Sequence, residues 1–187
     1  VTGGIAAYKA AELARLFVKA GADVRVVMTR SAGEFIGAMT FQAITGNETR
    51  SDLFDSAHEA AMGHIDLARW ADLVLVAPAS ADFMARLAAG LADDLLATLC
   101  LASDVPIVLA PSMNQQMWRN AATRDNAALL EHRGLELWGP VSGDQACGEQ
   151  GPGRMLEPQV LWRRVRARLL TGDLEGLRVL LTAGPTR

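Results

Sequence analysis

Residues 73–82 read Leu-Val-Leu-Val-Ala-Pro-Ala-Ser-Ala-Asp, an aliphatic run that ends at a proline and leads into small and polar residues. Such a run is typical of a buried strand, and the segment 82–101 that follows has a helical pattern broken near Gly90. Further short aliphatic runs, separated by helical patterns, lie at 24–29, 107–111, 135–138 and 178–182. This alternation predicts an α/β fold with a parallel sheet and helices on both faces.

The segments between the strands add detail. A first helix is predicted at 9–19, with polar residues at 9, 12, 15 and 19 opposite apolar residues at 13, 16 and 17, and Gly21 ends it. A last helix is predicted at 159–170. Between Pro140 and Pro158 periodicity disappears and glycines gather, which predicts a mobile loop. Val1 and Thr2 read as the middle of another strand, so we expect residues to precede them.

Composition excludes several classes of protein. The 187 residues are 50% hydrophobic and 21% charged, as in one globular domain, and the net charge is −3. The one basic cluster, Arg163–Arg168, is predicted on the solvated face of the last helix, so we expect no nucleic-acid partner. No apolar run approaches the roughly 20 residues that span a bilayer, and no export signal is visible. We therefore expect a cytoplasmic protein.

The segment Thr2-Gly3-Gly4-Ile5-Ala6-Ala7-Tyr8-Lys9 follows the first strand and opens a helix. Its unobstructed N–H groups and the positive end of the helix favour a phosphate there. The segment is neither a GxGxxG nor a Walker A motif. A plain tight turn is an equally good interpretation of the segment alone.

Two further segments lie where strands end. Thr29-Arg30-Ser31 follows the strand at 24–29, and Ser80-Ala81-Asp82 follows the strand at 73–78. Taken singly, each serine is more simply read as a helix N-cap. Ligands of open α/β sheets bind at the carboxyl ends of strands, so three such termini at one edge favour a nucleotide-like cofactor.

Two other side chains are candidates for chemistry. His64 precedes Ile-Asp-Leu, and an imidazole exchanges protons near neutral pH, although a lone histidine is more often a surface residue. Asn114, in Pro-Ser-Met-Asn-Gln-Gln-Met-Trp at 111–118, can donate to a carboxylate. The alternative is that Asn114 caps the next helix while Met117 and Trp118 pack inward.

The two cysteines lie 47 positions apart without metal-ligand spacing, so neither a metal site nor a disulfide is expected. Cys100 lies in an apolar helix and is predicted to be a small core residue. Cys147 lies in the glycine-rich segment 143–155, where a loop could act as a lid that delivers a proton donor.

Together these segments resemble the homo-oligomeric flavin-containing cysteine decarboxylases, and among them the phosphopantothenoylcysteine decarboxylases. The resemblance rests on residues 3–9, on His64 before Ile-Asp-Leu, and on the segments 77–82, 111–118 and 146–148. It implies a flavodoxin-like or Rossmann-like three-layer fold with FMN as cofactor. The implied reaction converts 4'-phosphopantothenoylcysteine to 4'-phosphopantetheine through thioaldehyde and enethiol intermediates, in coenzyme A biosynthesis.

The resemblance also assigns roles to single positions. His64 would be the catalytic base and Cys147 the proton donor, while Asn114, Met117 and Ala146 would contact the substrate and Arg69 its phosphate. The FMN site would comprise Gly3, Gly4, Ile5, Thr29, Ser31, Ser80, Ala81, Asp82, Phe83 and Ser112. Two positions depart from the family pattern, since Gly4 stands where many members have Ser and Asp82 where many have Asn.

The resemblance has consequences for organisation as well. It implies homotrimers, or dodecamers built from them, with flavin sites at subunit contacts. Residues 1–175 would form the decarboxylase domain, and 176–187 resemble the opening of a phosphopantothenoylcysteine synthetase domain, so a longer bifunctional protein is expected. Alternatives are a decarboxylase of C-terminal cysteine in peptides and a regulatory subunit without activity.

Overall fold

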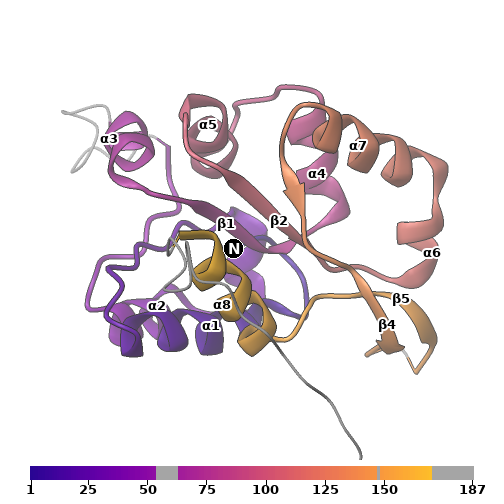
Figure 1. Cartoon of the computed structure of the whole chain (residues 1–187), viewed down its shortest axis with the longest axis horizontal. Helices are drawn as coiled ribbons and strands as arrows, with labels where there is room; N and C mark the ends of the chain where they lie inside the picture. Colours follow the sequence, from indigo (N-terminus) through magenta and orange to yellow (C-terminus); the bar gives the residue numbers. More distant parts are fainter. Residues whose placement is uncertain (54–62, 147, 170–187) are drawn as a thin grey trace, which may run out of the picture.

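Residues 1–53, 63–146 and 148–169 are described by the computed structural model of the chain (Figure 1). The helices are α1 (Ala7–Lys19), the 3-10 helix η1 (Arg30–Glu34), α2 (Ala38–Thr45), α3 (Gly63–Trp70), α4 (Ala81–Ala88), α5 (Leu95–Ala102), α6 (Gln115–Arg119), α7 (Ala121–His132) and α8 (Pro158–Leu169). The strands are β1 (Val74–Ala79), β2 (Ile107–Pro111), β3 (Glu136–Leu137), β4 (Val141–Asp144) and β5 (Gln150–Arg154). The expected helices at 9–19 and 159–170, and the break near Gly90, are confirmed.

A parallel sheet lies at the centre of the molecule, in the order β1-β2-β3. Val74 of β1 lies opposite Ile107 of β2, and Val108 of β2 lies opposite Glu136 of β3. The strands expected at 73–78, 107–111 and 135–138 are thus confirmed, with small shifts in their bounds. The strand expected at 178–182 lies outside the described residues.

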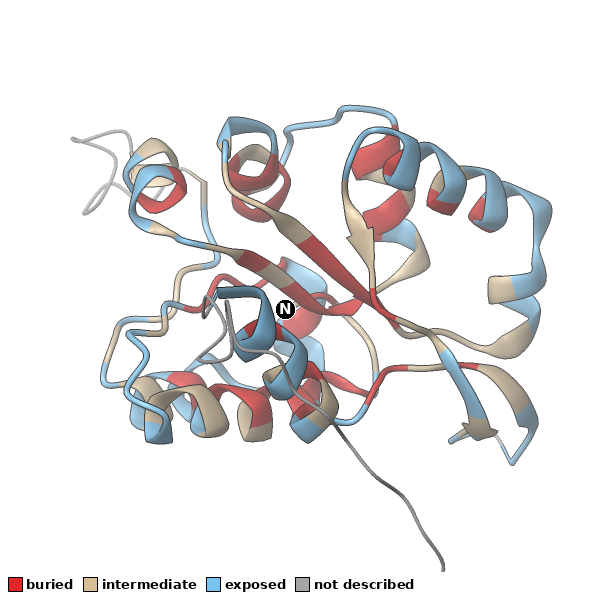
Figure 2. Cartoon of the chain, in the orientation of Figure 1, coloured by how far each residue is buried: buried red, intermediate tan, exposed pale blue. Residues whose placement is uncertain are grey.

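Helices cover both faces of this sheet, as the sequence predicts. Val74 and Val76 pack with α3, α4, α5 and α7, whereas Ala77 and Val108 pack with α1 and α8. Neighbouring residues of a strand point to opposite faces, so an unbroken aliphatic run supplies both cores at once. Figure 2 shows the buried residues along the central strands and on the sides of the helices that face them.

The segment 24–29, predicted as a strand, is extended but not a regular strand. Within the described residues its one bridge joins Val27 to Arg50 in a parallel sense. Val1 lies beside it, since the Thr29 N–H donates to the Val1 carbonyl at 3.0 Å. On the other side the Thr2 N–H donates to the Pro78 carbonyl at 3.3 Å. Val1 and Thr2 therefore join this segment to β1 for two residues only.

Next to Val1 the space between β1 and the segment 22–27 is a cavity of about 530 Å³. Leu73 and Leu75 line it from β1, Val26 from the opposite side, and Leu13 from α1. Without partners along this stretch the segment 24–29 forms no ladder, which explains why the expected strand is irregular.

The prediction of a loop at 140–158 is wrong in part, because β4 and β5 form an antiparallel hairpin there. Its glycines allow close packing against the segment before α6, where the Met113 N–H donates to the Gly153 carbonyl at 3.0 Å. A Cβ atom at Gly153 would collide with the Met113 carbonyl, and the φ of Gly153 is +145°. Tertiary contact thus selects the hairpin where local sequence favours a loop.

The arginines of α8 at 163, 164, 166 and 168 are exposed, as expected. Among the helices that the structure describes, none has the length and apolar character needed to cross a bilayer.

Candidate active site

The glycine loop, residues 3–6 before α1, packs closely on Ser31, which follows the extended segment 24–29. A Cβ atom at Gly3 would lie 2.6 Å from both Cβ and Oγ of Ser31, whereas one at Gly4 would meet nothing within 4 Å. Glycine at position 3 is therefore required by the packing. The open space at Gly4 leaves the loop N–H groups accessible on that side.

Thr2 joins this loop to the end of β1. Its hydroxyl donates to the Pro78 carbonyl at 2.9 Å and accepts from the Ser80 N–H at 2.9 Å. The side chain is almost completely buried. Thr2 was not among the candidate residues, since its role depends on residues more than 70 positions away.

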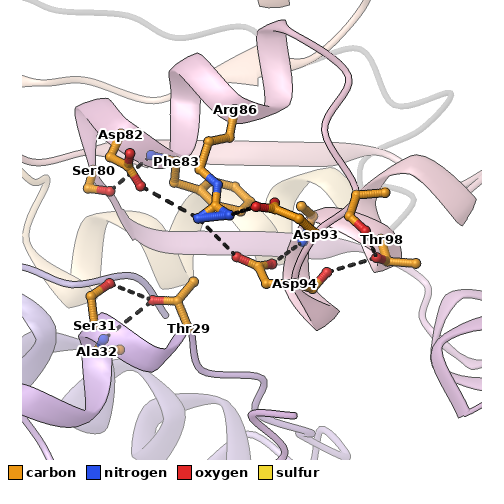
Figure 3. A network of polar contacts seen from close by, with 12 residues as sticks. Thr29, Ser31, Ala32, Ser80, Asp82, Phe83, Arg86, Asp93, Asp94 and Thr98 are labelled. Atoms are coloured by element: carbon orange, nitrogen blue, oxygen red, sulfur yellow. Dashed lines mark hydrogen bonds and ion pairs between the residues drawn. The ribbon is translucent and has the colours of Figure 1, made fainter. Parts of the chain in front are cut away.

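The hydroxyl groups of Thr29 and Ser31 lie 3.1 Å apart (Figure 3). The Thr29 hydroxyl accepts from the Ala32 N–H and caps η1, so reading Ser31 as the cap is wrong. Ser31 is exposed and lies against Gly3. Its hydroxyl is therefore available at the glycine loop.

At the end of β1, Ser80 caps α4, since its hydroxyl accepts from the Phe83 N–H at 3.2 Å. The capping interpretation is correct, and it keeps Ser80 at the same edge as Thr2. Ala81 is half-buried, and Phe83 lies in the core at 1% exposure. Phe83 thus serves packing within this chain.

Asp82 lies in a charged cluster that the sequence did not predict. Its carboxylate is exposed and lies 3.9 Å from Nη1 of Arg86, one turn further along α4 (Figure 3). Arg86 also pairs with Asp93 and with Asp94, which caps α5. The hydrogen bond from Arg86 holds the pKa of Asp93 below its usual range. Arg86 is thus shared among three carboxylates, and it offsets only part of the negative charge that Asp82 brings to the edge.

The carboxyl end of β2 lies beside the carboxyl end of β1 at the same edge of the sheet. The Ser112 N–H donates to the Ala79 carbonyl at 3.0 Å, which places Ser112 beside Ser80. Asn114 caps α6 through its Oδ1 atom, which accepts from the Gln116 N–H at 2.8 Å. The capping interpretation is correct for Asn114, but Met117 is 49% exposed and does not pack inward.

The Nδ2 atom of Asn114 faces the hairpin. It donates to Oε2 of Glu149 at 2.9 Å and to Oε1 of Gln145 at 3.3 Å. Gln145 and Glu149 were not singled out from the sequence, although both lie within the glycine-rich segment. Ala146 is exposed in the same turn, and Cys147 lies outside the described residues.

His64 and Arg69 lie on α3, which packs on α5. His64 is half-buried near the start of the helix, and Arg69 is exposed near its end. Figure 1 shows α3 on the opposite side of the molecule from α6 and the β4–β5 hairpin. Within one chain the structure does not bring His64 to Asn114.

Cys100 is buried in α5, as predicted, and burial raises the pKa of its thiol to about 12. A thiol of this kind stays protonated and unreactive near neutral pH. Among the described residues no group of histidines, cysteines or carboxylates is arranged to hold a metal ion.

Four segments of the predicted site thus share one edge of the sheet: the glycine loop, Thr29 to Ser31, Ser80 to Phe83, and Ser112 to Asn114. They offer a glycine cradle, hydroxyl groups and backbone N–H groups. These groups suit a phosphate-bearing planar cofactor bound along the carboxyl ends of parallel strands.

Comparison with known proteins agrees with this geometry. A family model described as Flavoprotein matches residues 1–170. The coenzyme A biosynthesis bifunctional protein CoaBC of Vibrio parahaemolyticus is 54% identical over 187 residues, covering 100% of this chain and 47% of that protein. That of Escherichia coli K12 is 53% identical over 188 residues and is covered to 46%. The chain spans about half the length of these relatives.

Solved structures with the same fold include a PPC decarboxylase mutant complexed with pantothenoylaminoethenethiol. It superposes with a TM-score of 0.79 at 32% identity, covering 89% of this chain and 93% of that one. The FMN binding protein AtHal3 gives a TM-score of 0.78 at 33% identity, covering 90% of this chain and 92% of that one. From its matched residues, its fold and the edge described above, the chain belongs to the Flavoprotein family.

Proposed function

We propose that this chain is an FMN-dependent decarboxylase that converts 4'-phosphopantothenoylcysteine to 4'-phosphopantetheine in coenzyme A biosynthesis. The proposal rests on one observation: the glycine loop, the hydroxyl-bearing segments and Asn114 all lie at the edge formed by the carboxyl ends of the parallel strands. It occurs in a chain whose relatives are named for coenzyme A biosynthesis and whose structural neighbour binds pantothenoylaminoethenethiol. We place the reaction in the cytoplasm.

The described residues fit FMN. The glycine loop offers N–H groups for the phosphate, and the hydroxyls of Thr29, Ser31, Ser80 and Ser112 lie on the segments that line the edge. Ile5, Ala81, Asp82 and the backbone of Phe83 complete the proposed set, since the Phe83 side chain lies in the core. The backbone is open at Gly4, where a Cβ atom would meet nothing within 4 Å, so a ligand can approach the loop closely on that side.

Bound FMN would supply the hydride acceptor that turns the cysteine CH2–SH unit into a thioaldehyde, and its reduced form would return the hydride after CO2 leaves. The chain's residues supply proton transfer and orientation. His64 takes a proton during the oxidation, Asn114 and Met117 hold the end that carries the carboxylate, and Arg69 meets the substrate phosphate. Cys147 donates a proton to the enethiolate carbon, which completes the product.

The proposed site is assembled from two copies of the chain. The helix α3, which carries His64, and α6, which Asn114 caps, lie on opposite sides of one molecule (Figure 1). The two residues can therefore serve one substrate only if neighbouring copies contribute them. Four large apolar side chains are exposed near the glycine loop, on α1 and on the segment that packs against it: Ile5, Tyr8, Phe35 and Met39. We propose homotrimers, or dodecamers built from them, in which these side chains are covered.

We also propose that a strand preceding Val1 fills the cavity beside β1. The cavity is lined by apolar side chains such as Leu75, Val26 and Leu13, so an apolar strand would be buried there beside β1. An added apolar strand should raise the unfolding midpoint more than a Gly/Ser extension of equal length, and equal midpoints would refute the idea.

At the other end, residues 176–187 are proposed to begin the phosphopantothenate–cysteine ligase part of a longer protein. The proposal is supported by relatives about twice as long as this chain, which are named bifunctional. Expression of the longer protein and an assay of both activities would test it.

The decarboxylase proposal is tested by an anaerobic absorbance spectrum before and after addition of 4'-phosphopantothenoylcysteine, with mass spectrometry of the product. Oxidised flavin bands and a product lighter by one CO2 are expected. Cys147→Ser should stop at the enethiol with flavin reduced, and His64→Asn should leave flavin oxidised. Bound flavin without turnover would favour the peptide-cysteine or regulatory alternatives.

A further inference from the structure

The Glu149 carboxylate accepts a hydrogen bond from the side-chain amide of Asn114, the group that binds the substrate carboxylate in the proposed function. Oε2 of Glu149 accepts from Nδ2 of Asn114 at 2.9 Å and from Nε2 of Gln115 at 3.1 Å. Both donors lie at the start of α6, whereas Glu149 lies in the turn between β4 and β5. A carboxylate of the chain itself thus lies on two converging amide groups.

The hairpin is held in place by further contacts that do not involve this carboxylate. Oε1 of Gln145 accepts from the Gln115 N–H at 3.1 Å, and Nε2 of Gln145 donates to the Pro152 carbonyl at 3.2 Å. The first of these bonds joins the hairpin to α6, and the backbone bond from Met113 to Gly153 adds a second link. Removal of the Glu149 carboxylate therefore leaves the hairpin attached to α6.

The chemistry of the contact permits exchange. Asn114 and Gln115 donate through neutral amides, which bind one carboxylate much as another. Glu149 is exposed, so its carboxylate is readily hydrated once it leaves the amides. An arriving carboxylate would therefore replace Glu149 without stranding a buried charge.

We infer that Glu149 acts as an internal substitute for the substrate carboxylate, which the substrate displaces from Asn114 on binding. This inference rests on the proposed function. The substrate has a carboxylate and the product has none, so the Glu149 contact returns once CO2 has left. Glu149 thereby weakens substrate binding but does not compete with the product, and the empty site is kept in a defined geometry.

The expected effect follows from a simple competition. If the Glu149-bound form is populated to about 90%, the apparent affinity for a competing carboxylate is about tenfold weaker than the intrinsic one. Glu149→Ala should therefore lower KM for 4'-phosphopantothenoylcysteine up to about tenfold. Inhibition by 4'-phosphopantetheine should not change, because this product does not need the carboxylate position.

The experiment compares the FMN-loaded wild-type protein with Glu149→Ala, Glu149→Gln and the control Asp144→Asn. Asp144 is exposed on β4 of the same hairpin, so the control removes a negative charge from the same element. KM, kcat and the product inhibition constant are measured for each. The side-chain amide resonances of Asn114 are followed by NMR, with and without 4'-phosphopantothenoylcysteine.

A lower KM with unchanged product inhibition in both Glu149 variants, and no such change in Asp144→Asn, would support the exchange. The Asn114 resonances should shift in both Glu149 variants, and in the wild type when substrate binds. Active enzyme with unchanged KM in both Glu149 variants would overturn the exchange while the decarboxylase function stands. If the wild type does not decarboxylate, the function and the exchange fall together, even where the Asn114 resonances still respond to Glu149.

Discussion

The Nζ atom of Lys9 lies 2.7 Å from Oε1 of Glu157, which joins the first turn of the helix after the glycine loop to the segment between β5 and α8. Lys9 is 9% exposed, so the loss of Glu157 would leave a buried ammonium group without its partner. We expect Glu157→Gln to lower the free energy of unfolding by about 1–3 kcal/mol. Urea unfolding measures this, and Glu131→Gln on the exposed face of α7 is the control.

The same pair predicts a dependence of stability on pH. The hydrogen bond from Lys9 holds the pKa of Glu157 below its usual value of 4.5. A carboxyl whose pKa is lowered by folding adds stability above its unfolded pKa and loses that contribution as pH falls through the folded value. Wild type and Glu157→Gln should therefore differ most above about pH 5 and converge below pH 4.5. A constant difference down to pH 2 would contradict this linkage.

From the packing of the glycine loop we expect opposite effects on stability and FMN binding for substitutions at Gly3 and at Gly4. Gly3→Ala places a Cβ atom 2.6 Å from Ser31, and we expect it to cost about 1–3 kcal/mol and weaken FMN binding. Gly4→Ser has open space and should keep or improve FMN retention, since it adds a hydroxyl beside the loop. Thermal unfolding and flavin absorbance after gel filtration compare the two. Equal effects would show that the loop does not pack as described.

Thr2 offers a test of the contact between the loop and β1. Thr2→Val keeps the shape but removes a donor and an acceptor that bind Pro78 and Ser80. We expect a loss of about 1–3 kcal/mol, because the Ser80 N–H loses its partner and the Pro78 carbonyl keeps only the bond from the Thr2 N–H. Thr123→Val, at a buried threonine of α7, is the matched control for the same chemical change. A loss no greater than in the control would mean that the Thr2 hydroxyl adds nothing.

Substitution of Gly153 tests whether the hairpin packs so closely on the segment before α6 that no side chain fits between them. Gly153→Ala introduces a side chain at φ +145° against the Met113 carbonyl, so the hairpin should detach from this segment. We expect faster proteolysis within 141–154 and a higher KM. Gly37→Ala, at a position with open space around it, should change neither. Proteolysis at the wild-type rate would show that the hairpin adapts to a Cβ atom.

The elements with local signals could be predicted from the sequence. The strand Val74–Ala79 is an aliphatic run with both faces buried, and the positive φ of Gly21 explains why α1 ends where the pattern does. Contacts between distant segments could not be predicted. Lys9 was assigned to the polar face of α1, yet it is buried against a carboxylate 148 positions away.

In the candidate site, too, the residues with a local sequence signal were predicted and those that depend on distant contacts were not. Its segments were found because glycine and hydroxyl residues follow strands, which is a local pattern. Thr2, Gln145 and Glu149 carry no such pattern, since their roles depend on partners that folding brings to them. The separation of His64 from Asn114 is likewise a property of the folded chain, because sequence order says nothing of which side a helix occupies.

The hydrogen bonds that join Thr2 to Pro78 and Ser80 also set an order for folding. Thr2 is held by residues 78 and 80, so the glycine loop that follows it cannot take its native form until β1 and the start of α4 are in place. Contacts between residues so far apart in sequence are slow to form, because the loop between them must close first. During synthesis the glycine loop, although made before β1, would reach its final structure only after β1 and the start of α4 have formed.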